Sequence, residues 1–260
     1  MTSNLGFRSQ PFPAYGFVIA AVSIAVVSCA MGPDLETRLL MGSRPVADKM
    51  RDAERKPAAV MKFLGVEPGM TAIDMIASGG YYTDVLAEAV GPEGKVYAQN
   101  VAFVLQIRDG VNDKAMTARL ADNRLPNVVR LDREIEDLGL EPGSVDFAFS
   151  ALNFHDILDG RGPEATATVL RAIYVILTDD GVFGLVDHAG DPGEENQARN
   201  KELHRIDEAR VIEAATAAGF VVEATSDILR NPADDRSSMV FAKEIRGRTD
   251  RFVLKLRKAD

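Results

Sequence analysis

The chain has 260 residues, of which 46% are hydrophobic and 27% are charged, and its formal net charge is −9. This length and composition are typical of one soluble domain with a substantial core and at most small extensions. The acidic balance argues against a nucleic-acid partner held on a basic surface, and no internal repeat or low-complexity tract is present.

The first 28 residues are predicted to be a signal peptide. Residues 17–27 form an uncharged apolar run that is too short for a comfortable bilayer span, and Cys29, the only cysteine, follows closely. The pattern resembles a bacterial lipoprotein signal, in which Cys29 becomes the lipidated first residue of the mature protein. It predicts an exported, membrane-anchored lipoprotein facing the periplasm, and Ala30 favours the outer membrane. The alternative is an ordinary secretory signal or N-terminal anchor with a chance cysteine.

Residues 29–43 are predicted to be a tether, and residues 44–260 are predicted to be the folded domain. Apolar periodicity predicts helices at residues 45–55, 58–64, 82–90, 113–121, 163–177 and 208–218. Apolar runs of strand length predict strands at residues 71–76, 95–98, 128–131, 145–149, 182–186, 220–225 and 251–256. Strands that alternate with helices indicate an α/β fold with a mainly parallel sheet covered on both faces.

The turn after the first strand is the most informative stretch. Residues 71–76 form an apolar run that ends at Ser78, Gly79 and Gly80, and a predicted helix follows at once. In a strand–turn–helix unit of this kind, the turn lets the backbone approach a nucleotide while the first N–H groups of the helix face the ligand.

Asp74, Gly80 and the helix after them resemble the first motif of class I S-adenosylmethionine-dependent methyltransferases, in which an acidic strand residue precedes a glycine-rich turn. The chain is most similar to a bacterial group of these methyltransferases, often exported, that carries a GYYT-like turn and a YAQN-like second strand. Further matching blocks follow in order at residues 153–156, 186–188, 204–207, 230–236 and 247–252. The resemblance implies a Rossmann-like, doubly wound sheet of seven strands with the last one antiparallel. It also implies S-adenosylmethionine as cofactor and methyl transfer to a small molecule.

Three residues depart from the usual pattern of this family. Ile76 and Ser78 stand where two further glycines are usual, and a β-branched residue adopts the positive φ of such a turn only at a cost. Asn100 ends the second strand where the family has an acid that binds the ribose hydroxyls, and an amide forms weaker hydrogen bonds than a carboxylate.

Ligands of such sheets bind outside the carboxyl ends of the strands, so polar residues that follow the strands are the candidate site. The predicted cofactor-binding residues are Asp74, Ser78, Gly79, Gly80, Tyr81, Asn100, Glu134 and Asn153. Glu134, after the third strand, is a candidate to reach an adenine amino group.

All the histidines of the chain, His155, His188 and His204, are predicted to lie at this same edge, each with an aspartate nearby. His155, Asp156 and His188 are the predicted catalytic residues, because a His–Asp pair can take a proton from the methyl acceptor. The same residue types can also bind a divalent metal, although their spacing is not that of a compact metal motif. A third interpretation is that Asp156, Asp187 and Asp207 cap helices or orient loops.

Two alternatives to an active methyltransferase stay open at this point. S-adenosylmethionine is made in the cytoplasm, where an exported protein has little access to it. Together with Ile76, Ser78 and Asn100, this suggests a methyltransferase-like lipoprotein that has lost the cofactor and works as a metal-dependent or ligand-binding protein. The other alternative is a non-catalytic lipoprotein with a surface for protein interactions.

Overall fold

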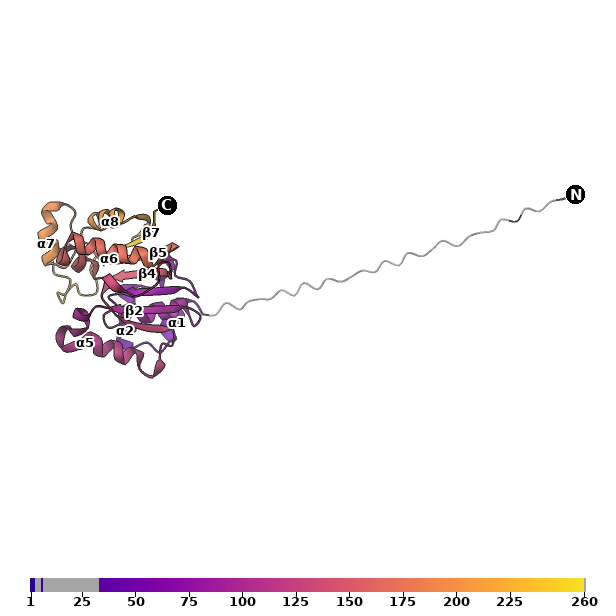
Figure 1. Ribbon diagram of the computed structural model, residues 1–260, viewed down its shortest axis with the longest axis horizontal. Helices are drawn as coiled ribbons and strands as arrows, with labels where there is room; N and C mark the ends of the chain where they lie inside the picture. Colours follow the sequence, from indigo (N-terminus) through magenta and orange to yellow (C-terminus); the bar gives the residue numbers. More distant parts are fainter. Residues whose placement is uncertain (3–5, 7–32, 260) are drawn as a thin grey trace. The chain divides into compact units, whose positions relative to one another are not determined.

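The computed structural model describes residues 1–2, 6 and 33–259, and Pro33–Asp260 form one compact unit (Figure 1). Most of the predicted signal peptide and the predicted lipidation site, Cys29, lie outside the described residues. Within the described ranges, no helix is both long enough and apolar enough to cross a bilayer.

A seven-stranded sheet with the order β3-β2-β1-β4-β5-β7-β6 forms the centre of this unit. The strands are β1 (Thr71–Met75), β2 (Lys95–Asn100), β3 (Val128–Asp132), β4 (Val145–Ala151), β5 (Leu177–His188), β6 (Phe220–Ser226) and β7 (Arg251–Lys258). β7 runs antiparallel to both of its neighbours, and the other pairs are parallel. The predicted Rossmann-like, doubly wound sheet with an antiparallel last strand is therefore confirmed. The strand order reverses between β1 and β4, which is where such sheets bind ligands.

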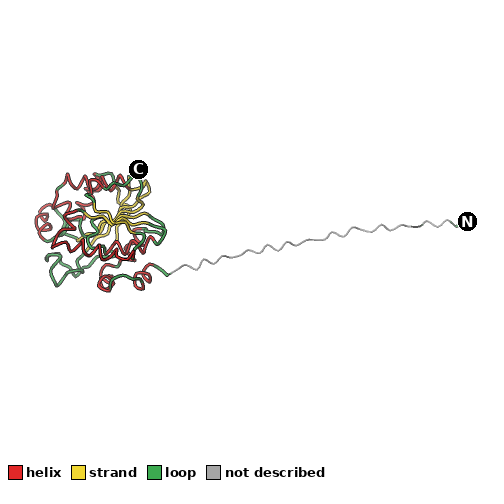
Figure 2. Tube along the Cα trace, turned by 60° about the horizontal axis from the view of Figure 1, so that its bottom comes forward, coloured by secondary structure: helices red, strands yellow, loops and turns green. Residues whose placement is uncertain are grey.

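Helices cover both faces of the sheet, so the strands form a central layer (Figure 2). The helices are α1 (Leu35–Met41), α2 (Val46–Arg55), α3 (Pro57–Leu64), α4 (Tyr81–Val90), α5 (Ala102–Leu120), α6 (Pro163–Ile176), α7 (Gln197–Glu202) and α8 (Glu208–Ala217). Because successive strand residues point to opposite faces, Ile73 packs in the cluster with α6 and α8, whereas Ala72 packs in the cluster with α3 and α4.

One helix, α5, differs clearly from its predicted extent. α5 begins at Ala102 rather than residue 113, and its backbone is non-helical from Ile107 to Gly110. That break interrupts the apolar periodicity, so only the second half of α5 is visible in the sequence. α8 agrees with its prediction, since the Asp207 side chain accepts a hydrogen bond from the Ala209 N–H (2.9 Å) and caps the helix.

Residues 35–41, assigned above to the tether, form helix α1 instead, and the compact unit begins at Pro33 rather than residue 44. Leu39 is buried against α3 and α4, and the Arg38 guanidinium donates a hydrogen bond to the Glu88 carbonyl in α4 (3.0 Å). A seven-residue helix has too weak an apolar pattern to be recognised alone, and its packing on the domain supplies most of its stability.

Candidate functional site

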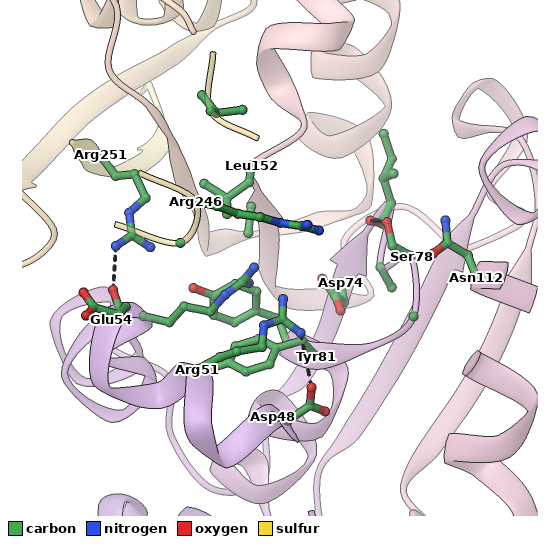
Figure 3. Close-up of a pocket in the computed structure, with 18 of the residues that line it drawn as sticks. Asp48, Arg51, Glu54, Asp74, Ser78, Tyr81, Asn112, Leu152, Arg246 and Arg251 are labelled. Atoms are coloured by element: carbon green, nitrogen blue, oxygen red, sulfur yellow. Dashed lines mark hydrogen bonds and ion pairs between the residues drawn. The ribbon is translucent and has the colours of Figure 1, made fainter. Parts of the chain in front are cut away.

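An open cleft of about 870 Å³ lies at the carboxyl ends of β1, β4 and β5 (Figure 3). Its walls come from separate parts of the chain: residues 48–55 of α2, 74–82 around the β1–α4 turn, 112–119 of α5, the strand ends at 151–152 and 188, and the segment 240–251. The volume is near the upper end of the range for small-molecule sites, roughly 300–1,000 Å³. The side chain of Ile76 lines the cleft and leaves it open.

The β1–α4 turn keeps the backbone shape of a glycine-rich turn without the usual glycines. Ile76, Ser78 and Gly80 have φ values of 52°, 53° and 82°, all in the left-handed region. For Ile76, a β-branched residue, this conformation costs on the order of 1–3 kcal/mol. The expected strain is present, so the rest of the fold must stabilise the turn.

Two side chains at the end of β2 hold this turn in place. The Asn100 amide accepts a hydrogen bond from the Ser78 N–H (2.7 Å) and donates one to the Ser78 carbonyl (3.2 Å). Gln99 accepts a hydrogen bond from the Ile76 N–H (2.9 Å). Asn100 is fully buried and does not line the cleft, so in this structure it braces the turn and does not offer its amide to a ribose.

The glycines of the turn also allow α5 to approach it closely. A Cβ on Gly80 would lie 2.7 Å from Cδ of Arg119, which is closer than real Cβ contacts. The Arg119 guanidinium donates a hydrogen bond to the Gly79 carbonyl (2.7 Å) and forms ion pairs with Asp48 of α2 and Asp84 of α4. Gly79 lines the cleft, whereas Gly80 faces α5 behind it.

Asp74 is a buried acid near the end of β1, and it lines the cleft. Its carboxylate accepts a hydrogen bond from the Thr83 hydroxyl (2.7 Å), and only 3% of the residue is exposed. Burial raises the pKa of Asp74 to about 7, although the Thr83 bond and Arg119 oppose the shift. The cleft thus contains an acid that titrates near neutral pH.

The raised pKa of Asp74 predicts a pH-dependent stability. Between about pH 4 and pH 7 the folded protein keeps this proton while the unfolded chain releases it, so the contribution of Asp74 to the free energy of unfolding falls as pH rises through that window. Asp74→Asn removes this dependence. The free energy of unfolding of Asp74→Asn, measured with urea, should therefore rise relative to that of the wild type between about pH 5 and about pH 8. An equal difference between the two proteins at both pH values would mean that Asp74 does not titrate in this range.

Arginines dominate the charge of the cleft, although the chain as a whole is acidic. Arg55, Arg246 and Arg251 line the cleft, and no carboxylate of the described residues lies within 4.0 Å of their guanidinium groups. Arg251 is only 4% exposed and donates to the backbone carbonyls of Thr249 (3.2 Å) and Glu54 (2.5 Å).

Two arginines of α2, Arg51 and Arg55, lie over the Tyr81 ring, and Figure 3 shows Arg51 beside it. The guanidinium groups of Arg51 and Arg55 lie 4.6 and 4.5 Å from the ring centroid, and the Tyr81 hydroxyl donates to Asp52 (2.6 Å). Arg246 lies across the cleft from this group. The arginines were not predicted from the sequence, because α2 and the segment 240–251 are far apart in the chain and meet only in the folded protein.

Two other predicted cofactor-binding residues have structural roles and do not line the cleft. Glu134 is exposed and accepts a hydrogen bond from the Ala102 N–H at the start of α5 (3.1 Å). Asn153 joins two strand ends, because it accepts from the Ser150 hydroxyl (2.6 Å) and donates to the Met75 carbonyl (3.1 Å). Of the predicted site residues, the cleft contains Asp74, Ser78, Gly79, Tyr81 and His188.

The predicted catalytic residues separate into two groups. His188 lines the cleft, and its Nδ1 lies 2.6 Å from the Thr249 hydroxyl. Burial lowers the pKa of His188 to about 3, so the ring stays neutral and is a weak proton acceptor. His155 and Asp156 lie beside the cleft instead, and the ring centroids of His155 and His188 are 5.8 Å apart.

Solved structures share this fold over most of their length. A SAM dependent methyltransferase from Aquifex aeolicus aligns with a TM-score of 0.58 at 20% identity, over 81% of this chain and 96% of its own. An arsenic(III) S-adenosylmethionine methyltransferase from Chlamydomonas reinhardtii aligns with a TM-score of 0.54 at 18% identity, over 89% of this chain and 75% of its own. The fold is that of class I S-adenosylmethionine-dependent methyltransferases.

The fold does not by itself fix the reaction. The cyclase SpnF aligns with a TM-score of 0.57 at 15% identity, over 80% of this chain and 82% of its own. No protein-family model matches the chain, and no curated protein matches it significantly. The prediction of a protein that has lost the cofactor finds no support in these comparisons.

Proposed function

We propose that the protein is an S-adenosylmethionine-dependent methyltransferase that acts on a small anionic molecule. The observation that carries this proposal is the open cleft of about 870 Å³ beside a turn whose residues 76, 78 and 80 have left-handed backbone conformations. It occurs in a fold whose solved neighbours include S-adenosylmethionine-dependent methyltransferases. The volume lies near the upper end of the range for small-molecule sites, which suits a cofactor together with a small acceptor.

The residues around the turn fit the cofactor. The backbone of Ser78 and Gly79 and the ring of Tyr81 offer one wall, and the Asp74 carboxylate offers a partner for an ammonium group. When bound, S-adenosylmethionine supplies an electrophilic methyl group on a sulfonium. The apolar side chains of Ile76 and Leu152 line the same cleft.

The arginines indicate the charge of the acceptor. Arg246 and Arg251 belong to the segment that closes the cleft opposite α2, and neither has a carboxylate partner among the residues described. Arg251, whose guanidinium is buried without a counter-ion among the described residues, favours an anionic ligand, and the exposed Arg246 adds positive charge to the same wall. Methyl transfer needs mainly alignment of the acceptor with the methyl group, so holding the acceptor by its charge is the principal task of these residues.

The test is a calorimetric titration of the full-length protein with S-adenosylmethionine. We expect a single site with micromolar affinity, and S-adenosylhomocysteine should compete for it. An absence of binding at millimolar cofactor would remove the proposal. If the cofactor binds, transfer of a labelled methyl group to acceptors supplied as matched carboxylate and amide pairs tests the preference for an anion.

We also propose that the chain is exported and anchored through lipid on Cys29. The supporting features are the apolar run at residues 17–27 and the sole cysteine after it. Incorporation of labelled palmitate in a bacterial host should occur in the wild-type chain and disappear in Cys29→Ser. Equal labelling of both proteins, or of neither, would contradict the anchor.

A further inference from the structure

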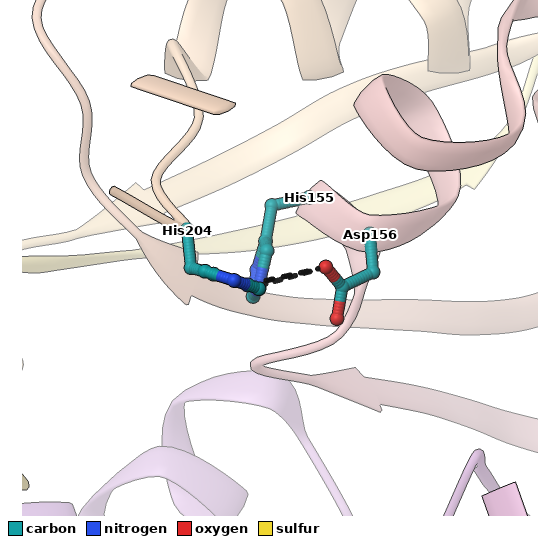
Figure 4. A group of neighbouring side chains, drawn as sticks. All are labelled: His155, Asp156 and His204. Atoms are coloured by element: carbon teal, nitrogen blue, oxygen red, sulfur yellow. Dashed lines mark ion pairs between the residues drawn. The ribbon is translucent and has the colours of Figure 1, made fainter. Parts of the chain in front are cut away.

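His155, Asp156 and His204 form a compact cluster beside the cleft (Figure 4). One ligand atom from each side chain lies within 4.8 Å of the other two. Asp156 Oδ1 is 3.3 Å from Nδ1 of His204 and 3.6 Å from Nε2 of His155, so one carboxylate oxygen faces both rings. His155 and Asp156 follow β4, whereas His204 follows α7, and only the fold brings them together.

The nitrogen of His204 in this cluster has no hydrogen-bond partner. Nδ1 of His204 is buried from solvent, and within the described part of the chain no group forms a hydrogen bond of acceptable geometry with it. The backbone of His204 is left-handed, with φ of 55°. Buried polar atoms usually have a hydrogen-bond partner, and left-handed backbone at a non-glycine residue is strained. Both features at one residue indicate a preformed binding site.

The buried carboxylate of Asp187 fixes the other imidazole. Asp187 is fully buried, and its Oδ1 lies 2.8 Å from Nδ1 of His155, while its Oδ2 accepts the His155 backbone N–H (2.8 Å). This contact orients the ring so that Nε2 points toward Asp156 and His204. A carboxylate on the outer nitrogen of a histidine is the usual second-shell partner of a metal-binding imidazole.

From this geometry we infer that His155 Nε2, His204 Nδ1 and Asp156 Oδ1 bind a divalent transition metal such as zinc. Tetrahedral ligands at about 2.0–2.2 Å from a metal are about 3.4 Å apart, close to the two shorter separations seen here. Two imidazoles and one carboxylate are a common donor set for zinc, and three protein ligands leave a coordination position open.

The metal site borders the cleft. Phe241 lines the cleft and lies 5.0 Å from the His204 ring between centroids, and cleft-lining His188 lies beside His155. An open coordination position here is suited to hold an oxygen or sulfur atom of a molecule in the cleft. The inference itself rests on the cluster alone and does not require that the protein bind S-adenosylmethionine.

Zinc titration of the full-length protein, after treatment with a chelator and its removal, tests the site. We expect one equivalent of zinc to bind, and His204→Ala and Asp156→Asn to weaken binding at least about tenfold. His204 and Asp156 are partly or largely exposed, so these variants should fold, which circular dichroism checks. Asp187→Asn should weaken binding about 10–100-fold although Asp187 does not touch the metal.

Matched controls separate this site from general zinc binding. Asp179→Asn and Asp227→Asn each remove an exposed carboxylate outside the cluster, and both should bind zinc as the wild type does. The inference is overturned if the wild type binds less than half an equivalent. It is equally overturned if His204→Ala binds as tightly as the wild type, or if Asp179→Asn loses as much affinity as His204→Ala.

Discussion

Replacement of Ala115 by tryptophan is expected to lower the affinity for S-adenosylmethionine by at least about 100-fold, which corresponds to about 2.7 kcal/mol. Ala115 is an exposed residue of α5 that lines the cleft, and its Cβ lies 3.1 Å from where a Cβ of Gly79 would be. An indole at this position must occupy the space in front of the β1–α4 turn. Calorimetric titration with the cofactor measures the loss.

The same helix offers a matched control. Ala118 is also exposed on α5 but does not line the cleft, so Ala118→Trp should bind the cofactor as the wild type does. Both variants add a tryptophan at a solvent-accessible helix position, and their melting temperatures should stay close to that of the wild type. Unchanged binding in Ala115→Trp would show that the cofactor does not sit against this turn.

The second large effect is expected from Arg205→Met, which should lower the free energy of unfolding by about 3–5 kcal/mol. The side chains of Arg205 and Asp234 are 0% and 1% exposed, and two hydrogen bonds of 2.8 and 3.0 Å join them. Removal of the guanidinium leaves a buried carboxylate without its counter-ion. Urea unfolding measures the change.

This ion pair also holds the segment that closes the cleft. The Asp234 carboxylate accepts hydrogen bonds from the backbone N–H groups of Arg236 (3.0 Å) and Asp250 (2.6 Å). The Arg205 guanidinium donates to the Ser238 carbonyl (3.1 Å). Arg205→Met should therefore weaken ligand binding as well as stability, although Arg205 does not line the cleft.

Two further variants show whether the pair acts as described. Arg205→Met combined with Asp234→Asn should recover part of the lost stability, because no unpaired charge then remains buried and the amide oxygen can still accept one of the two backbone N–H bonds. Arg199→Met breaks the half-exposed pair with Asp191 and should cost no more than about 1 kcal/mol. A loss below about 1 kcal/mol in Arg205→Met itself would contradict the role assigned to this buried pair.

Local patterns were enough to predict the strands and a mainly parallel sheet. The β1–α4–β2 unit and the remaining strands follow from apolar runs separated by helical periodicity, and Asp207 marks the start of α8. The resemblance of Asp74 and Gly80 to a methyltransferase motif correctly indicated the fold and the antiparallel β7. These features depend on residues that are neighbours in the sequence or on opposite faces of one strand.

Within the cleft, the sequence identified the residues of the turn but not what each side chain does. Asn100 and Glu134 lie at or after the strand ends as expected, yet their side chains accept hydrogen bonds from backbone N–H groups and do not line the cleft. A polar side chain at a strand end either faces a ligand or braces a turn, depending on which backbone groups lie within hydrogen-bond distance. The sequence does not show those distances.

The sequence by itself therefore determined the strands, most of the longer helices and the position of the ligand edge, because periodicity and turn residues act over a few neighbouring positions. Only the tertiary structure decided which charges meet. Arg55 and Arg251 come together across the cleft, and His204 joins His155 and Asp156, through packing of segments that are far apart in the chain. Electrostatic and metal-binding chemistry depends on distances of a few ångströms, which arise only once the chain has folded.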